Sequence, residues 1–136
     1  MITAVDSNVL LDVFQADARF GRRSADALER SLAEGAVVAC EVVWSEIVAA
    51  FGSASAATDA LARIGLVYDP LTVLAASRAG TAWRSYRERG GPRTRMIADF
   101  LVAAHAEQQT DRLLTRDRGF YRRAFGELQL IDPTKK

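Results

Sequence analysis

The chain has 136 residues, 49% of them hydrophobic and 26% charged, with a net charge of +1, a balance typical of a soluble globular domain and not of a disordered segment. Its apolar runs are shorter than the roughly 20 residues that span a bilayer, and its N-terminus lacks a signal-peptide pattern, so we expect a cytoplasmic protein with no membrane partner. The single Cys40 and single His105 exclude an internal disulfide and a Cys/His zinc site.

Strands and helices alternate along the sequence. The first predicted strand covers residues 2–5, and a short helix follows at 8–14. A second helix, over 22–35, has apolar residues at helical spacing and ends at a glycine. A second strand is predicted at 36–40. Apolar residues at positions i, i+3, i+4 and i+7 then predict a helix over 44–51.

The second half continues this alternation. In chain order, we predict a helix over 54–65, a strand at 66–69, a helix over 71–90, a helix over 95–109, a strand at 112–115, a short helix at 118–125 and a strand at 128–131. Strands that alternate with helices predict a parallel sheet covered on both faces, and therefore a three-layer α/β/α fold with about five strands.

Acidic residues recur where predicted strands end or helices begin. Each has a structural explanation on its own, because acids are common at helix starts as caps or as partners of the helix dipole. If the first strand is central, however, all four side chains lie in the cleft where open α/β sheets bind ligands. The four residues are Asp6, Glu46, Asp99 and Asp117.

Four carboxylates in one cleft repel one another. Two charges about 6 Å apart in a medium of effective dielectric ~20 cost roughly 3 kcal/mol. A divalent cation that prefers oxygen ligands, Mg²⁺ or Mn²⁺, would relieve this repulsion. Such ions activate a water molecule and stabilise a leaving oxygen, which suits the hydrolysis of phosphodiester bonds.

The basic residues are concentrated in the second half of the chain. Residues 1–79 contain six Arg and ten acids, whereas residues 80–123 contain ten Arg and five acids. Guanidinium groups suit the phosphates of a nucleic acid, although a charged run is also typical of a solvated surface. Arg95, Arg116 and Arg118 flank two of the acids. For these arginines, contact with substrate phosphate and surface ion pairing both stay open.

The loop at residues 87–95, RERGGPRTR, has two explanations. It is either the end of a helix followed by a turn, or a mobile basic lip over a site.

Four segments resemble the PIN-domain nucleases in their order and spacing: AVDSNVLLDVF, WSEIVAAF, MIADFLVAAHA and LLTRDRGF. The length is similar to that of the VapC-type toxins of bacterial toxin–antitoxin pairs. The resemblance implies a single PIN domain over residues 1–136 and a metal-dependent endoribonuclease whose RNA substrate is often a tRNA or ribosomal RNA. It also implies a cognate antitoxin and a homodimer. By the same resemblance, the catalytic, metal-binding residues are Asp6, Glu46, Asp99 and Asp117, with Asn8 and Thr115 lining the site.

One position of this quartet has a competitor. Glu41 precedes Glu46 by five residues and adjoins the end of the second strand. We favour Glu46 because its helical context, EIVAAF, matches the family pattern.

Other α/β enzymes fit less well. A haloacid-dehalogenase-type phosphatase resembles D-x-D after the first strand, but Asn8 removes its general acid. A response-regulator receiver needs a lysine at a late strand end, whereas the lysines here are Lys135 and Lys136. No phosphate-binding loop motif is present. Two functional alternatives stay open: a housekeeping PIN nuclease in RNA processing, and a non-catalytic PIN domain that binds RNA.

The other noticeable residues are expected to be structural. We interpret Cys40 as a core residue and His105 as structural or at the surface. Trp83 and Tyr86 could stack on bases, but packing or a dimer contact is the preferred interpretation.

Overall fold

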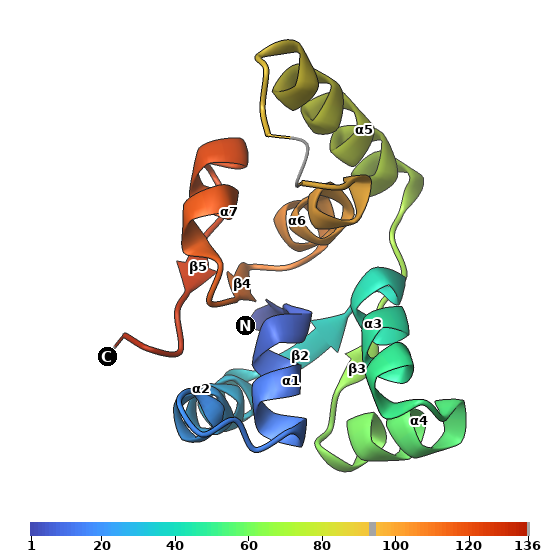
Figure 1. Ribbon diagram of the computed structural model, residues 1–136, viewed down its shortest axis with the longest axis vertical. Coiled ribbons are helices and arrows are strands. Elements are labelled where there is room, and N and C mark those ends of the chain that lie inside the picture. The colour runs from blue at the N-terminus through green and yellow to red at the C-terminus, as the bar shows by residue number, and fades with distance from the viewer. Residues whose placement is uncertain (93–94, 136) are drawn as a thin grey trace.

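The computed structural model describes residues 1–92 and 95–135, and its five strands form one parallel sheet (Figure 1). The strand order is β3-β2-β1-β4-β5, so the first strand is central, which meets the condition under which the four acids were expected to share one cleft. The strands are β1 (Ile2–Val5), β2 (Ala36–Ala39), β3 (Val67–Tyr68), β4 (Arg112–Leu114) and β5 (Leu130–Ile131).

Seven helices of the described residues connect the strands, and the predicted alternation is confirmed. The helices are α1 (Ser7–Phe14), α2 (Gly21–Glu34), α3 (Glu41–Phe51), α4 (Ala54–Arg63), α5 (Val73–Glu88), α6 (Ile97–Gln109) and α7 (Arg118–Ala124). None of the helices in this part of the chain is both long and apolar enough to cross a membrane.

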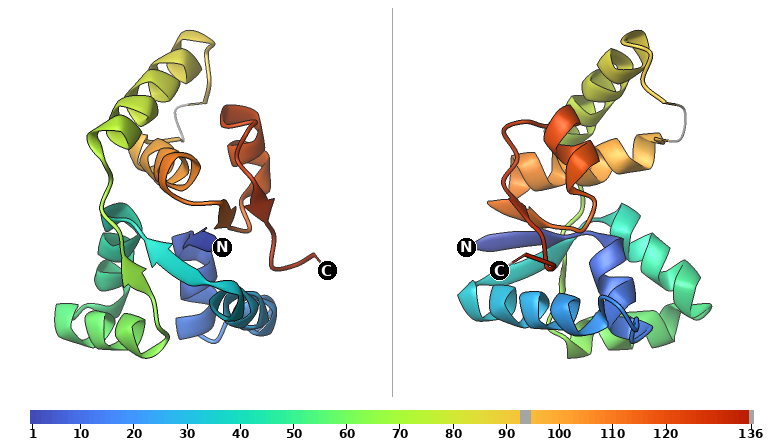
Figure 2. Two further views of the ribbon diagram at one scale, coloured as in Figure 1. Left: turned by 180° about the vertical axis from the view of Figure 1, so that it is seen from behind. Right: turned by 60° about the vertical axis from the view of Figure 1, so that its left-hand side comes forward.

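The helices form two layers, one on each face of the sheet (Figure 2). Helices α1 to α4 cover one face, and α5 to α7 cover the other. This division follows from right-handed crossover connections. The chain moves outward from β1 to β3 on one side, then returns past β1 and builds β4 and β5 on the other. The predicted three-layer α/β/α architecture is therefore confirmed.

The point where the strand order reverses lies between β1 and β4. The two strands are paired in parallel, with Val5 opposite Leu114, and the Asp6 amide continues the ladder by donating to the Leu114 carbonyl at 3.0 Å. Open α/β sheets form their ligand crevice at such a reversal, beyond the carboxyl ends of the strands. The residues that follow β1 and β4 consequently face one another across this crevice.

Several helix ends differ from the predictions by one to three residues, and two of these differences have a local cause. Helix α3 begins at Glu41 rather than Trp44, because its first turn also has a core residue, Val43, which is buried with Ile47. Helix α5 begins at Val73, where the Thr72 hydroxyl accepts a hydrogen bond from the Ala75 amide at 3.1 Å. Both differences concern helix ends and leave the predicted site residues on their expected elements.

Aromatic rings hold α7 against α5 and α6. Phe100 of α6 packs edge-on against Phe120 of α7 at 5.2 Å between centroids, and Tyr86 of α5 contacts both rings. Tyr86 is therefore a packing residue, as predicted. The predicted basic segment at 87–95 partly falls on residues 93–94, which lie outside the described residues. Its first part ends α5 at Glu88, as the helix-end explanation expects.

Candidate active site

Asp6 occupies the centre of the crevice, directly after β1. The residue is only 7% exposed. One carboxylate oxygen, Oδ1, accepts from the Ser7 amide at 2.8 Å, so Asp6 caps α1. The other, Oδ2, accepts from the hydroxyl groups of Thr115 at 2.8 Å and Tyr121 at 3.0 Å. Asp6 therefore caps α1 and also lies in the crevice. The structural explanation, a helix cap, and the functional one, a site residue, are compatible.

Burial raises the pKa of Asp6 above its ordinary value. The hydrogen bonds from Thr115, Tyr121 and Ser7 lower the pKa again, and the charge of Asp117 raises it further. The pKa of Tyr121 lies well above its ordinary value because the phenol is buried and close to the Asp6 carboxylate. Tyr121 is thus kept protonated and donates its hydrogen to Asp6.

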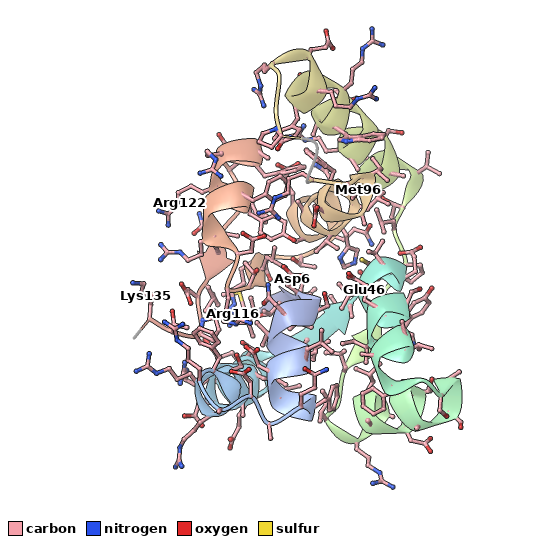
Figure 3. The ribbon with its side chains drawn as sticks, in the orientation of Figure 1. Asp6, Glu46, Met96, Arg116, Arg122 and Lys135 are labelled. Carbon is pink, nitrogen blue, oxygen red and sulfur yellow. The ribbon has the colours of Figure 1, made fainter. Side chains whose placement is uncertain are left out.

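Glu46 approaches the same crevice from α3. Its Oε1 accepts from the Ser7 hydroxyl at 3.1 Å. Figure 3 shows Glu46 on α3 and Asp6 at the start of α1. Loss of hydration raises the pKa of Glu46, and the charges of Asp6 and Asp99 raise it further. The rival acid of α3, Glu41, instead accepts from the Leu71 amide at 2.9 Å. The geometry therefore brings Glu46, and not Glu41, beside Asp6.

Asp99 lies in the first turn of α6. Its Oδ2 accepts from the Met96 amide at 3.1 Å, so the carboxylate satisfies a backbone donor at the helix start. Its charge also raises the pKa values of Glu46 and Tyr121. The structural explanation of Asp99 is thus observed, and the same carboxylate contributes to the electrostatics of the crevice.

Asp117 precedes α7 but does not cap it. No side-chain capping bond is formed at this position; instead the Asp117 amide donates to the Thr115 hydroxyl at 3.0 Å. Its carboxylate pairs with the Arg95 guanidinium, at 2.6 Å from Nη1 to Oδ2 and 3.2 Å from Nη2 to Oδ1. This pair raises the pKa of Arg95. Of the predicted basic residues, Arg95 is therefore the one that reaches the acids.

The donor set suits a hard divalent cation, because it consists of carboxylate oxygens beside a threonine and an asparagine. The arrangement is not that of a closed metal site: within the described residues, no three His, Cys, Asp or Glu side chains lie close enough together to hold a metal ion. Arg95 instead pairs with Asp117, and the Met96 amide donates to Asp99.

Asn8 connects the two halves of the site. Its Nδ2 donates to Thr115 Oγ1 at 3.3 Å and makes a longer contact of 3.4 Å with Asp6 Oδ2. Its Oδ1 accepts from the Arg116 amide at 3.2 Å. Asn8 and Thr115 therefore lie beside Asp6, and they connect α1 with the loop after β4.

The Arg116 side chain points away from the acids. It forms a two-point ion pair with Asp12 of α1, at 2.7 and 2.9 Å, and its guanidinium lies 4.1 Å from the centre of the Phe20 ring. Arg118 approaches Asp132 at 3.6 Å. Both arginines therefore form ion pairs, which is one of the two explanations that the sequence left open.

Two residues of the site were not anticipated from the sequence. Tyr121 contacts Asp6 although 115 residues separate them, and only its place four residues after Asp117 on a helix could have suggested the contact. Ser7 joins Asp6 to Glu46, because its amide donates to Asp6 and its hydroxyl donates to Glu46.

The residues expected to be structural behave so. Cys40 is buried in the core, as predicted. His105 is also buried, and its Nε2 lies 2.9 Å from Asp69 Oδ2. Trp83 is half-buried, with the Arg87 guanidinium 4.9 Å from its ring centre.

Comparison with known proteins gives a family and a fold. Residues 3–126 match the family model described as PIN domain. No curated protein sequence matches the chain.

Among solved structures, VapBC-1 from nontypeable Haemophilus influenzae is similar with a TM-score of 0.77 at 18% identity, over 99% of this chain and 100% of that chain. VapBC2 from Rickettsia felis, bound to a promoter DNA fragment, has a TM-score of 0.76 at 14% identity, over 97% and 98%. A toxin–antitoxin complex from Klebsiella pneumoniae has a TM-score of 0.70 at 19% identity, over 98% and 99%.

Proposed function

Because the chain belongs to the PIN domain family, we propose that it is a Mg²⁺- or Mn²⁺-dependent endoribonuclease and the toxin of a toxin–antitoxin pair. The proposal is supported by four acids from separate elements whose charges act on one another: Asp117 raises the pKa of Asp6, and Asp6 and Asp99 raise the pKa of Glu46. These acids are Asp6, Glu46, Asp99 and Asp117. Two of them have raised pKa values, in part because of their neighbours' charges, which is typical of a site that binds a cation or transfers protons.

The residues of the crevice have distinct roles in this proposal. Asp6, Glu46, Asp99 and Asp117 would hold one or two divalent ions. A bound Mg²⁺ or Mn²⁺ supplies a water molecule of lowered pKa and stabilises negative charge on the leaving oxygen. Thr115 and Tyr121 orient the Asp6 carboxylate by donating to its Oδ2. Ser7 orients Glu46. Arg95, which pairs with Asp117, would contact a substrate phosphate once Asp117 binds the ion.

A cleavage assay on purified protein tests this activity. Attack by water predicts products with a 5′-phosphate and a 3′-hydroxyl, formed with Mg²⁺ or Mn²⁺ and lost in excess EDTA. Glu46→Gln and Asp6→Asn should each lower the rate by about a hundredfold or more. Glu41→Gln is the matched control on the same helix and should keep the activity, because Glu41 faces Leu71. A 2′,3′-cyclic phosphate product, or cleavage that persists in EDTA, would contradict the proposal.

The toxin role rests on similarity to structures whose names describe toxin–antitoxin complexes, some of them bound to DNA. We propose that this chain also has a cognate antitoxin partner and forms a homodimer in the cytoplasm. Induction in cells should arrest growth, and the Asp6→Asn variant should not. Mapping of RNA ends in the same cells would identify the target RNA. Cleavage without growth arrest would favour the housekeeping nuclease, and RNA binding without cleavage the non-catalytic domain.

A further inference from the structure

A cavity of about 440 Å³ lies between the C-terminal end of α5 and helix α7. This volume is within the range of roughly 300–1,000 Å³ that is typical of sites for small ligands. The cavity is outside the acidic crevice, and the four acids do not line it. Its described lining residues are Tyr86, Arg89, Gly91, Pro92, Arg95, Phe120, Arg123 and Ala124.

The charge of this cavity is positive. Arg89, Arg95 and Arg123 line it, and none of its described lining residues is acidic. Arg95 has Asp117 as its partner. Within the part of the chain that the structure describes, no carboxylate lies within ion-pair distance of Arg89 or Arg123. Two guanidinium groups are thus available to an anionic ligand, and such groups bind phosphate in a two-point geometry.

Two aromatic residues, Tyr86 and Phe120, form part of the cavity wall. The Tyr86 hydroxyl donates to the Pro92 carbonyl at 3.0 Å, which holds the chain after α5 against the ring. A Cβ atom at Gly91 would lie 2.4 Å from the same ring, so a larger residue there would displace the ring. Next to the Tyr86 ring, the Arg95 guanidinium lies 4.3 Å from the centre of the Phe120 ring. Arginines held beside aromatic rings are typical of grooves for single-stranded nucleic acids.

Arg95 connects this cavity with the acids. It lines the cavity and also forms the ion pair with Asp117. Arg123 lies six residues after Asp117, on the helix that begins directly after it. If a nucleic-acid strand places one phosphate at the acids, its adjacent nucleotide lies next to the arginine-lined cavity.

We propose that this cavity binds the nucleotide next to the cleaved bond of a single-stranded RNA, with Arg89 and Arg123 on its phosphate. The inference rests on the proposed ribonuclease function and adds a substrate subsite to it. An acidic peptide would also suit the arginines. The aromatic wall and the direct connection to the acids through Arg95 favour a nucleotide instead.

Binding of a fluorescent single-stranded RNA decamer tests the proposal, with EDTA present so that cleavage cannot consume the probe. The Arg89→Gln/Arg123→Gln double variant should bind about tenfold more weakly. The slope of log affinity against log salt should fall by about 1.4, since each arginine–phosphate contact on a single strand contributes about 0.7. Arg122→Gln is the matched control, because Arg122 neighbours Arg123 but projects from α7 away from α5 and α6 (Figure 3). It should change the affinity less than twofold.

The outcomes separate this proposal from the activity on which it rests. If the natural chain binds and cleaves RNA while the double variant binds as tightly as the Arg122→Gln control, the subsite is wrong and the ribonuclease function stands. If the natural chain neither binds nor cleaves RNA, both are wrong. If the double variant loses affinity for polyglutamate but not for RNA, the cavity serves an acidic protein partner and the nucleotide subsite is overturned. The melting temperature of each variant checks that its fold is intact.

Discussion

The Arg95 guanidinium and the Asp117 carboxylate form a two-point ion pair at 2.6 and 3.2 Å, at the border between the acidic crevice and the arginine-lined cavity. Arg95 thus takes the place beside Asp117 that a divalent cation would take in the proposed nuclease. Asp117 cannot serve both cations with the same lone pairs. The ion pair and the metal should therefore compete.

Removal of Arg95 should strengthen metal binding. In the Arg95→Ala variant, Asp117 no longer has to leave an ion pair, and a nearby positive charge is lost. Because exposed pairs of this kind contribute up to about 1 kcal/mol, we expect Mn²⁺ to bind up to about fivefold more tightly in isothermal titration calorimetry. Arg84→Ala, which removes an exposed pair with Glu88, is the control and should leave the affinity unchanged. Weaker binding to Arg95→Ala would mean that Arg95 supports the site rather than competing for it.

The stability of the metal-free protein should depend on pH through Asp6 and Glu46. The pKa values of both carboxyl groups are raised in the folded state, mainly by burial and loss of hydration. The folded state therefore holds these protons more tightly than the unfolded state, whose carboxyl groups have pKa values of about 4. Stability from these two groups is present below the unfolded pKa values and is lost as the pH rises through the folded ones.

Thermal melts of the natural chain and the Asp6→Asn/Glu46→Gln variant, in EDTA, measure this contribution. The melting temperature of the natural chain, relative to the variant, should fall as the pH rises from about 4 toward neutrality. Comparison with the variant cancels the other acids of the chain. A difference that is constant with pH, or that grows in favour of the natural chain, would contradict the assignment of raised pKa values.

Tyr121→Phe should alter the acidity of Asp6. The phenol donates to Asp6 Oδ2 at 3.0 Å, and this hydrogen bond lowers the pKa of the carboxyl group. Without it, we expect a stability loss of about 1 kcal/mol and a shift of Mn²⁺ binding to higher pH. Tyr86→Phe is the control, because Tyr86 bonds to the Pro92 carbonyl and not to the acids. Identical pH profiles of Mn²⁺ binding for the two variants would argue against a role of Tyr121 at Asp6.

The positions of the acids follow from local sequence patterns. The strand at residues 2–5 ends at Asp6, and the strand that ends before Thr115 precedes Asp117. Alternation of strands and helices implies a parallel sheet, and the carboxyl ends of parallel strands lie at the same edge. The prediction that Glu46 faces Asp6 needed the helical context of Glu46 in addition. The crevice was therefore predictable from where elements begin and end.

The partners of these acids were not predictable in the same way. Tyr121 and Asp6 are 115 residues apart, and Arg116 and Asp12 are 104 apart, so no periodicity relates them. Arg95 and Arg116 each precede an acid closely and look alike in the sequence, yet one pairs with Asp117 and the other with Asp12. Which partner an arginine takes depends on how helices pack, because that packing decides the direction of each side chain.

The ion pair of Arg116 with Asp12 can be tested as a structural contact, separate from substrate binding. Asp12 has a side chain that is only 5% exposed, and Ser24 and Arg116 both donate to it. Arg116→Ala would leave this buried carboxylate with the Ser24 hydroxyl but without its countercharge. Because the Arg116 side chain is 28% exposed and water can replace part of it, we expect the free energy of unfolding to fall by about 2 kcal/mol, less than for a fully buried pair. Chemical denaturation measures this loss. At a temperature where the variant is fully folded, its KM for RNA should equal that of the natural chain, since the guanidinium faces Asp12 and Phe20. A raised KM with unchanged stability would instead show that Arg116 contacts the substrate.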